Sequence, residues 1–329
     1  AVNSATGTVM LNSNWCINID SSTYAETVTI SSLTFAYSTN TFTIQSDPGL
    51  VSTRTRVSPT SASAFDIKSA SVNIIGIDIV PTASVAYGIT ASSAYVTISS
   101  VNVDANDNIT TAGMRISSWS VISYSSVTVT AAHGFYLYYA LGSTISYSSV
   151  VSSAAAEYPV YFQGGSNNTF LVSVASNGYA GSSAYSVNLN DSDSNTISGS
   201  FIYSGYRGLL FNSNANYNTV TLSTVIGAAS YGLYINASDS NTVTLSYMQG
   251  FDAILLNTGA DYNTVSLSTM IGTFAGFYAI ASASNTVTSS HMQGPSYGAR
   301  LDTDAGYNTI SLSTMIATSN YGLYIVNKA

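Results

Sequence analysis

The chain has 329 residues, of which only 7% are charged, and its formal net charge at pH 7 is −8. An ordinary soluble domain carries charge on about 25% of its residues, so Ser, Thr, Asn and Tyr must take the place of charge on this surface. A surface this poor in Lys and Arg excludes an electrostatic site for nucleic acid. No apolar run approaches the roughly 18 residues of a membrane-spanning helix, so we expect no membrane insertion.

The pattern of residues 1–63 predicts strands in coils of irregular length. Apolar and polar residues alternate, as around Val9 and Leu11, which is typical of half-buried strands. The segment 51–63 is rich in Ser, Thr and Arg and is predicted to be a longer loop. We find no amphipathic pattern that would place a helix over the first coil.

Residues 64–194 predict further coils of variable length. Apolar pairs such as Phe65 with Ile67 and Phe135 with Leu137 recur at steps of 21 to 28 residues. Shorter alternating segments lie between these pairs and predict additional strands. The unequal steps indicate that loops of different length leave this part of the chain.

Residues 195–329 repeat with a nearly fixed period. An Asn followed by Thr and then Val or Ile recurs every 22 or 23 residues, and a fixed period in this range indicates a solenoid. In the repeat that begins at Asn218, strict alternation predicts a strand with Val220 and Leu222 on its buried face. The residues of this repeat that are predicted to face solvent are Thr219, Thr221 and Ser223.

Each repeat holds three short apolar segments, and none of them is long enough for a helix. Strands this short cannot pair with one another inside a coil, so they must pair in parallel with the equivalent strands of neighbouring coils. The sequence therefore predicts an all-β parallel β-helix of about 14 coils with three strands in each coil. We find no linker, so we expect a single domain over residues 1–329.

The Asn-Thr-Val/Ile-Ser/Thr-Leu-Ser units resemble those of right-handed parallel β-helix repeat proteins, the pectate-lyase-like superfamily. The resemblance covers most of the chain and implies the fold rather than an activity, because the superfamily includes lyases, hydrolases, epimerases, adhesins and fibre proteins. Its polygalacturonase-like members carry an Asp-Asp pair, a Gly-His-Gly and an Arg-x-Lys. None of these motifs is present here, and His133-Gly134 lacks the first Gly. We therefore expect the non-catalytic surface or fibre type.

One Asn at the start of the first strand of each regular coil is predicted to have a structural role. Asn tolerates left-handed backbone conformations, and its amide can bond to the Asn of the coils above and below. We expect a structural ladder at Asn195, Asn218, Asn241, Asn263, Asn285 and Asn308.

The Thr and Ser residues that follow each of these Asn residues predict a flat hydroxyl array along one face of the rod. Thr favours strands because it is β-branched, and this alone accounts for the pattern. A surface that binds ice or glycan is the alternative interpretation.

A column of Tyr residues precedes the Gly position of the third strand. Stacked aromatic rings could hold sugar rings or a neighbouring subunit, although packing over a turn also explains them. We predict lateral or glycan contacts at Tyr87, Tyr158, Tyr185, Tyr231, Tyr297 and Tyr321.

Acidic residues gather in the turns before the Asn column, and carboxylates on neighbouring turns can bind calcium. They do not fall on matching positions of consecutive coils, so we predict no cofactor, with calcium as the alternative. These acidic residues are Asp191, Asp193, Asp239, Asp261, Asp302 and Asp304.

Catalysis would need a convergent set of acidic and basic groups. The nearest grouping in the sequence is Asp104, Asp107 and Arg115, with His133 one coil further on. Because no recognisable catalytic motif surrounds them, we predict that the chain is not an enzyme.

Several features fit an extracellular protein. Cys16 is the only cysteine, so no intrachain disulfide can form. The chain is also poor in Lys and rich in Ser and Thr. Sequons for N-glycosylation occur at Asn108, Asn167, Asn190 and Asn236, and in a chain this rich in Asn and Ser some are expected by chance.

The repeat pattern runs close to both ends of the chain, where a solenoid normally has capping elements. We therefore expect copies of the chain to cover each other's ends, and a head-to-tail contact that does not close makes a filament. The predicted function is an extracellular or cell-surface structural or adhesive protein, with cell-surface glycans as further partners. The alternative is a polysaccharide-active enzyme of the lyase or epimerase kind. The third interpretation is a glycan- or ice-binding surface module.

Overall fold

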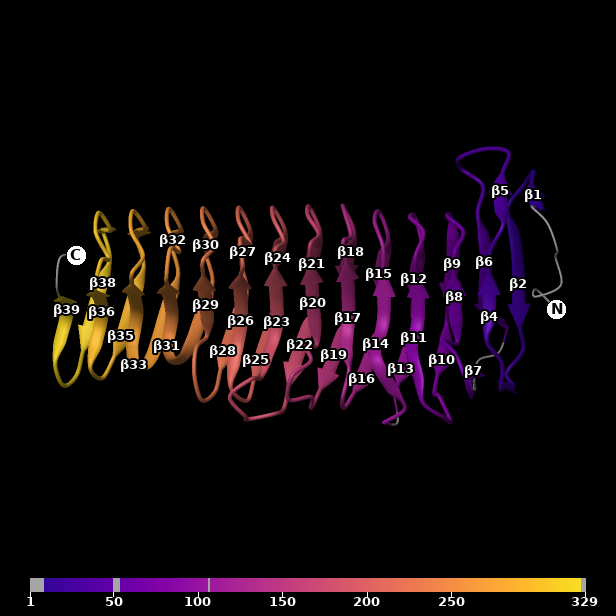
Figure 1. The fold of residues 1–329 in the computed structure, drawn as a ribbon, viewed down its shortest axis with the longest axis horizontal. Helices are drawn as coiled ribbons and strands as arrows, with labels where there is room; N and C mark the ends of the chain where they lie inside the picture. The colour runs from indigo at the N-terminus through magenta and orange to yellow at the C-terminus, as the bar shows by residue number, and fades with distance from the viewer. Residues whose placement is uncertain (1–8, 50–53, 106, 327–329) are drawn as a thin grey trace.

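The computed structural model describes residues 9–49, 54–105 and 107–326, and the regular elements in these ranges are all β-strands. The strands wind into a rod in which the chain advances coil by coil from one end to the other (Figure 1). No helix in the described ranges is long and apolar enough to cross a membrane. The predicted all-β parallel β-helix of about 14 coils is confirmed.

The first strand of each coil belongs to a sheet of 13 strands, and each strand pairs in parallel with its equivalent in the next coil. These strands are β2 (Trp15–Ile19), β6 (Phe42–Ser46), β9 (Val72–Ile75), β12 (Thr97–Ser99), β15 (Val121–Ser123), β18 (Thr144–Ser146), β21 (Thr169–Leu171), β24 (Thr196–Ser198), β27 (Thr219–Thr221), β30 (Thr242–Thr244), β32 (Thr264–Ser266), β34 (Thr286–Thr288) and β37 (Thr309–Ser311).

The second and third strands of each coil belong to a larger sheet of 24 strands, in which the pairing is again parallel. The second strands are β3 (Thr23–Tyr24), β7 (Thr55–Val57), β10 (Ile77–Ile79), β13 (Asn102–Asp104), β16 (Ser126–Val129), β19 (Ser149–Ser152), β22 (Val174–Asn177), β25 (Phe201–Ser204), β28 (Thr224–Gly227), β35 (His291–Gly294) and β38 (Thr314–Ala317). The third strands are β4 (Val28–Ile30), β8 (Phe65–Ile67), β11 (Val85–Ala91), β14 (Ile109–Ile116), β17 (His133–Tyr138), β20 (Val160–Gln163), β23 (Tyr185–Asn190), β26 (Arg207–Asn212), β29 (Leu233–Asn236), β36 (Tyr297–Asp302) and β39 (Tyr321–Ile325).

Two coils depart from this plan because their second and third strands run together. Strands β31 (Tyr247–Asn257) and β33 (Thr269–Ile280) each serve as both strands of their coil, and their mutual register shifts between Gly250 and Asp252. At the N-terminal end, β1 (Val9–Leu11) and β5 (Leu33–Phe35) form a separate two-stranded sheet, which projects from one side of the rod (Figure 1).

The core consists of like residues stacked along the rod. Val220, Val243, Val265 and Val287 are partners in successive coils and are almost completely buried. Burying one such side chain stabilises the fold by about 1.5–3 kcal/mol. Because most of this burial is against the coils above and below, each coil depends on its neighbours, as in other solenoids.

The Asn column forms a ladder of hydrogen bonds beside this core. The backbone N–H of Asn195 donates to Oδ1 of Asn218 at 2.8 Å, and the same bond joins each later Asn of the column to the next. The ladder begins one coil before the sequence pattern does, because the N–H of Asn168 donates to Oδ1 of Asn195 at 2.9 Å. The pattern missed Asn168 because Phe170 stands where the later repeats have Val or Ile.

One expectation for the regular repeat is wrong. Leu222 is not on the buried face: β27 ends at Thr221, and Leu222 turns the corner with a φ of 51° and a side chain that is 63% exposed. Ser223 is buried instead, and its hydroxyl donates to the carbonyl of Thr221 and accepts from the N–H of Ser200. The predicted hydroxyl array therefore loses its Ser column and consists of two Thr-rich columns.

Candidate functional site

The outward side chains of the third strands, together with side chains from the turns that lead into these strands, form a surface rich in tyrosine and arginine, which we term the aromatic face. Strand alternation produces it, because Phe135 and Leu137 of β17 point into the core and Tyr136 and Tyr138 must then point outward. The described residues of the aromatic face that are used below are Tyr87, Arg115, His133, Tyr136, Tyr138, Glu157, Tyr158, Tyr161, Tyr185, Arg207 and Tyr231.

The centre of the aromatic face is one column of residues in exact strand register. Arg115 of β14 pairs with Tyr136 of β17, which pairs with Tyr161 of β20. The rings of Tyr136 and Tyr161 are parallel within 5°, and their centroids are 5.4 Å apart. Parallel β-helix register therefore aligns one guanidinium and two phenol groups on three successive coils.

Arg115 is flanked by aromatic rings. Its guanidinium carbon lies 4.5 Å from the ring centroid of Tyr138 and 5.9 Å from that of Tyr87. Such cation–π contacts are worth about 0.5–1 kcal/mol at exposed sites. They hold the planar cation over the surface, where it can bind an anionic group in a bidentate manner.

His133 lies beside this column with both ring nitrogens engaged. The backbone N–H of Tyr158 donates to Nδ1 at 3.0 Å, so Nδ1 carries a lone pair. Nε2 lies 2.7 Å from Oε2 of Glu157 and is assigned the proton on this basis. The imidazole is nearly buried, with the rings of Tyr136, Tyr158 and Tyr161 within 5.5 Å of it.

Glu157 comes from a turn and not from a strand. It lies in residues 153–159, which join β19 to β20 and are longer than the corresponding turn of the regular coils. Its carboxylate remains partly exposed while it accepts the bond from His133. The insertion therefore brings one accessible, oriented carboxylate to the aromatic face.

Burial makes the central tyrosines weaker acids than a free tyrosine. It raises the pKa of Tyr136 to about 12, with contributions from Tyr161 and Tyr138 and an opposing one from Arg115. Burial also raises the pKa of Tyr161 to about 12, and Tyr158 and Glu157 add to the shift. Both phenols are therefore protonated and weakly acidic at neutral pH, and the hydroxyl of Tyr136 donates to Oε1 of Gln163.

The aromatic face continues toward the C-terminus. Tyr158 contacts the edge of Tyr185, and the Nη1 group of Arg207 donates to the Tyr185 hydroxyl at 2.6 Å. The Arg207 guanidinium carbon also lies 5.3 Å from the ring centroid of Tyr231. The structure therefore joins three of the predicted Tyr residues into one surface, Tyr158 to Tyr185 by a ring contact and Tyr185 to Tyr231 through Arg207.

A second polar cluster lies on the same sheet near the C-terminal end. The Nη2 group of Arg300 pairs with Oδ2 of Asp302 at 2.5 Å, and the hydroxyl of Tyr278 donates to the same oxygen at 3.2 Å. Asp252 is buried nearby, and burial raises its pKa to about 7 against an opposing effect of Arg300. Within the described ranges, Oδ1 of Asp252 and Nε of Arg300 are buried without a hydrogen-bond partner.

The remaining predicted groups are dispersed. Asp239 and Asp261 use their carboxylates to accept backbone N–H bonds from the next coil. No three His, Cys, Asp or Glu side chains of the described part of the chain are placed to hold a metal ion. Two of the sequon residues, Asn190 and Asn236, lie in strands with their side chains hydrogen-bonded to Asn212. Asn108 donates to the carbonyl of Pro81, and Asn167 is exposed.

The grouping that the sequence offered for catalysis is only half assembled. Arg115 and His133 meet through Tyr136 and Tyr138. Asp104 ends β13 and Asp107 lies in the turn before β14. Sequence reasoning missed Tyr136 and Tyr161, although the alternation of Phe-Tyr-Leu-Tyr could have identified the first. No local pattern signals Glu157.

No family model and no curated protein sequence matches the chain. Among solved structures, the A-module of mannuronan C-5 epimerase AlgE4 from Azotobacter vinelandii has a TM-score of 0.68 at 10% identity, over 88% of this chain and 91% of that one. The AlgE6 A-module from the same organism has a TM-score of 0.59 at 11% identity, over 84% and 91%. The Dettilon tailspike protein has a TM-score of 0.55 at 13% identity, over 87% and 62%.

These similarities show that the fold is the right-handed parallel β-helix. They contradict the prediction that the chain is not an enzyme, because two of the three structures are epimerase modules that match over most of their length. The prediction failed for a physical reason. In a solenoid the groups of a site come from different coils and are brought together by strand register, so the lack of a short linear motif says little about catalysis.

Proposed function

We propose that this protein acts on a polysaccharide that lies along the aromatic face. The observation that carries the proposal is the Arg115–Tyr136–Tyr161 column beside the His133–Glu157 pair. Successive coils are about 4.8 Å apart, a spacing similar to the rise of one sugar in an extended chain. Because sugar rings pack on aromatic rings, a chain parallel to the rod axis would meet one side chain of this column per sugar.

The groups present suit removal of a proton from the carbon next to a sugar carboxylate. In this proposal Arg115 binds the carboxylate and stabilises the negative charge that develops on it. Glu157 accepts the proton, and His133 holds Glu157 in position through its Nε2–H. A protonated Tyr136 or Tyr161 then supplies a proton, either to the carbon from the other face or to the departing glycosidic oxygen. The first outcome is an epimerase reaction and the second is a lyase reaction.

The first experiment compares binding and turnover of mannuronan, polygalacturonate and an uncharged glucan. We expect the acidic polymers to bind, and we expect conversion to appear as unsaturated chain ends or as exchange of a sugar C–H in deuterated water. Arg115→Met should weaken binding of the converted polymer by about 10- to 100-fold, as expected for loss of a charged hydrogen bond worth about 1.5–3 kcal/mol.

The matched control is Arg54→Met, since Arg54 pairs with Asp78 near the N-terminal end and lies away from the aromatic face. It should bind like the wild type. Equal binding of the uncharged and acidic polymers, or equal losses in the two variants, would contradict the assignment of Arg115. Absence of binding to any of the three polymers would contradict the proposed use of the aromatic face for these substrates.

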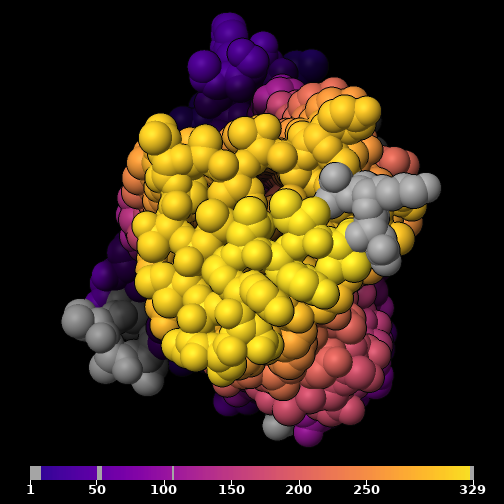
Figure 2. Space-filling view, turned by 90° about the vertical axis from the view of Figure 1, so that its left-hand side faces the viewer, coloured from indigo at the N-terminus to yellow at the C-terminus, as the bar shows by residue number. Residues whose placement is uncertain are grey.

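Head-to-tail assembly is a second proposal, supported by the last described coil. Its inward residues Met315 and Leu323 are partly exposed, whereas their partners Met292 and Ala299 one coil earlier are buried. Side chains of the last coils form this end of the rod (Figure 2). A further coil, from the same or another chain, would cover them.

Electron microscopy of the purified protein without crosslinking tests this assembly. We expect thin fibres whose axial repeat equals the length of one rod. Uniform short rods at all concentrations would contradict it. An extracellular or cell-surface location, where a polysaccharide substrate or a fibre would be found, is part of both proposals.

A further inference from the structure

A second exposed surface follows the corner between the first and second strands of each coil. From the coil of β9 onward, one residue per described coil takes a positive φ there, as Leu222 does, and in every such coil but the last its N–H donates to a carbonyl of the next coil. In seven coils this residue is large and apolar, with its side chain at least 47% exposed. We term these residues the corner stripe: Tyr124, Tyr147, Val172, Leu222, Leu245, Leu267 and Leu312.

The fold itself does not require apolar residues at this corner. A left-handed backbone costs an ordinary L-residue roughly 1–2 kcal/mol, and the equivalent positions in other coils hold Ser100, Gly199 and Ser289. Leu222, Leu245 and Leu267 are more than half exposed, so they return little of this cost by packing inside the rod. A partner that covers these leucine side chains from outside the chain would explain why they are apolar.

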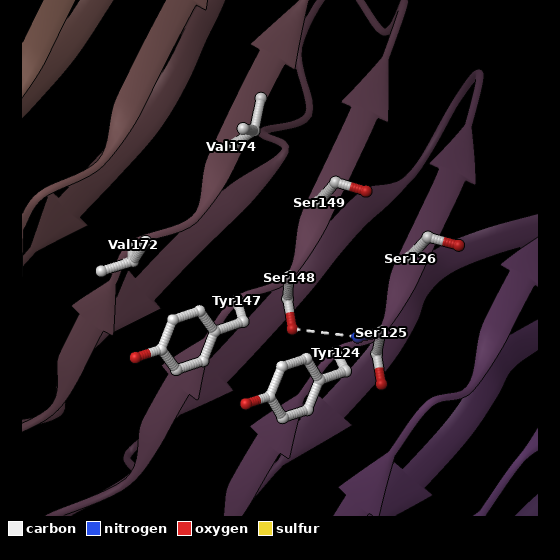
Figure 3. A pocket seen from close by; sticks show the side chains of 8 residues that line it. All are labelled: Tyr124, Ser125, Ser126, Tyr147, Ser148, Ser149, Val172 and Val174. Atoms are coloured by element: carbon white, nitrogen blue, oxygen red, sulfur yellow. Dashed lines mark hydrogen bonds between the residues drawn. The ribbon is translucent and has the colours of Figure 1, made fainter.

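The neighbouring strands widen the stripe. Val174 of β22 and Phe201 of β25 point outward beside it and are about 40% exposed. A shallow hollow lies between Tyr124, Tyr147, Val172 and Val174, and the two tyrosine rings line it side by side (Figure 3). These rings are parallel within 6° and their centroids are 5.2 Å apart.

The apolar area is large enough for a stable interface. The corner stripe with Val174 and Phe201 comprises nine large apolar side chains, each at least 40% exposed, whereas the largest apolar patch of a typical monomer is roughly 300–600 Å². Each partner of a standard protein interface buries about 800 Å². None of the residues of the stripe is charged, so no electrostatic feature of it selects a partner of opposite charge.

We propose that the corner stripe binds the corner stripe of a second copy of this chain. A second rod of this kind has the same axial spacing as the stripe and carries apolar side chains at that spacing, so it can place an apolar group against the residues of the stripe in successive coils. A two-fold axis perpendicular to the rods brings the same patch of both copies together and closes the contact as a dimer. This inference does not depend on the aromatic face, which lies on the outward side of the third strands.

The test replaces three residues of the stripe with Asn in one variant, Leu222→Asn with Leu245→Asn and Leu267→Asn. Asn accepts a left-handed backbone more readily than Leu, so the coils should keep their fold, which circular dichroism will check. We expect the wild type to form side-by-side pairs at micromolar concentration, seen as a dimer by sedimentation or as paired fibres where the rod ends also associate. The variant should lose this pairing, with a dissociation constant for the lateral contact raised about 100-fold or more.

A matched control carries Tyr217→Asn, Tyr262→Asn and Tyr307→Asn. These tyrosines are also exposed and also have positive φ, but they lie at the corner before the first strand. The control should remain a dimer. A wild type that stays monomeric throughout, or a stripe variant that dimerises like the wild type, would overturn the proposal. Association that continues unchanged in the stripe variant would come from another surface, such as the rod ends, and would overturn it as well. A wild type that stays monomeric and binds polysaccharide on the stripe would also overturn the proposal.

Discussion

Glu157→Gln should slow conversion of the preferred acidic polysaccharide by about 10²- to 10⁴-fold, the range found when a general base is removed. The Gln side chain keeps an oxygen that can accept the bond from Nε2–H of His133, which lies 2.7 Å from the present carboxylate. The geometry of the site should therefore persist while the base is lost. Steady-state kinetics and a separate binding measurement should show that turnover falls and that affinity changes by only a few-fold.

Glu26→Gln is the control. Glu26 is the only other glutamate of the chain and lies near its N-terminal end, away from the aromatic face. Glu26→Gln should leave both turnover and affinity unchanged. Turnover by Glu157→Gln that stays close to the wild-type value would show that Glu157 is not the base. If Arg115→Met bound the polysaccharide weakly in the same experiments, the aromatic face would remain the proposed binding site. Only the assignment of Glu157 as the base would then be wrong.

Asp252→Asn should stabilise the protein at pH 8 and leave its stability at pH 4 nearly unchanged. Burial raises the pKa of Asp252 to about 7, from an ordinary value of 3.8. Below about pH 4 the carboxyl is protonated in both the folded and the unfolded chain. As the pH rises toward 7, the unfolded chain releases this proton and the folded chain does not, so the free energy of unfolding falls. At about 1.4 kcal/mol per pKa unit, the loss is on the order of 4 kcal/mol at most.

Urea unfolding at several pH values will measure this effect, because Asn has the shape of the protonated acid and does not ionise. The wild type should lose stability between pH 4 and pH 7 relative to the variant, and the difference should then level off. Asp304→Asn is the control, since Asp304 is exposed, and it should show no such divergence. A variant that is less stable than the wild type at pH 8 would mean that the charged form of Asp252 is held by groups that stabilise it.

The local regularities of the chain were enough to predict most of the repeat. Val220 and its partners follow the two-residue alternation of a strand, and the alternation is correct for as long as the chain stays in a strand. It fails at Leu222, because the alternation cannot tell where a three-residue strand ends and the corner begins. The same failure hid the corner stripe, whose residues look like core residues in the sequence.

The sequence by itself determined the architecture of this protein. A period of 22–23 residues with three short strands leaves only pairing between coils to satisfy the backbone, and the Asn at each repeat start then becomes a ladder. Only the tertiary structure decided which side chains meet on the surface. Arg115, Tyr136 and Tyr161 are 21 and 25 residues apart in the chain but are neighbours in one column, and a turn insertion carries Glu157 to His133. Such groupings depend on the register and on the length of each turn together, and no local window of the sequence contains both.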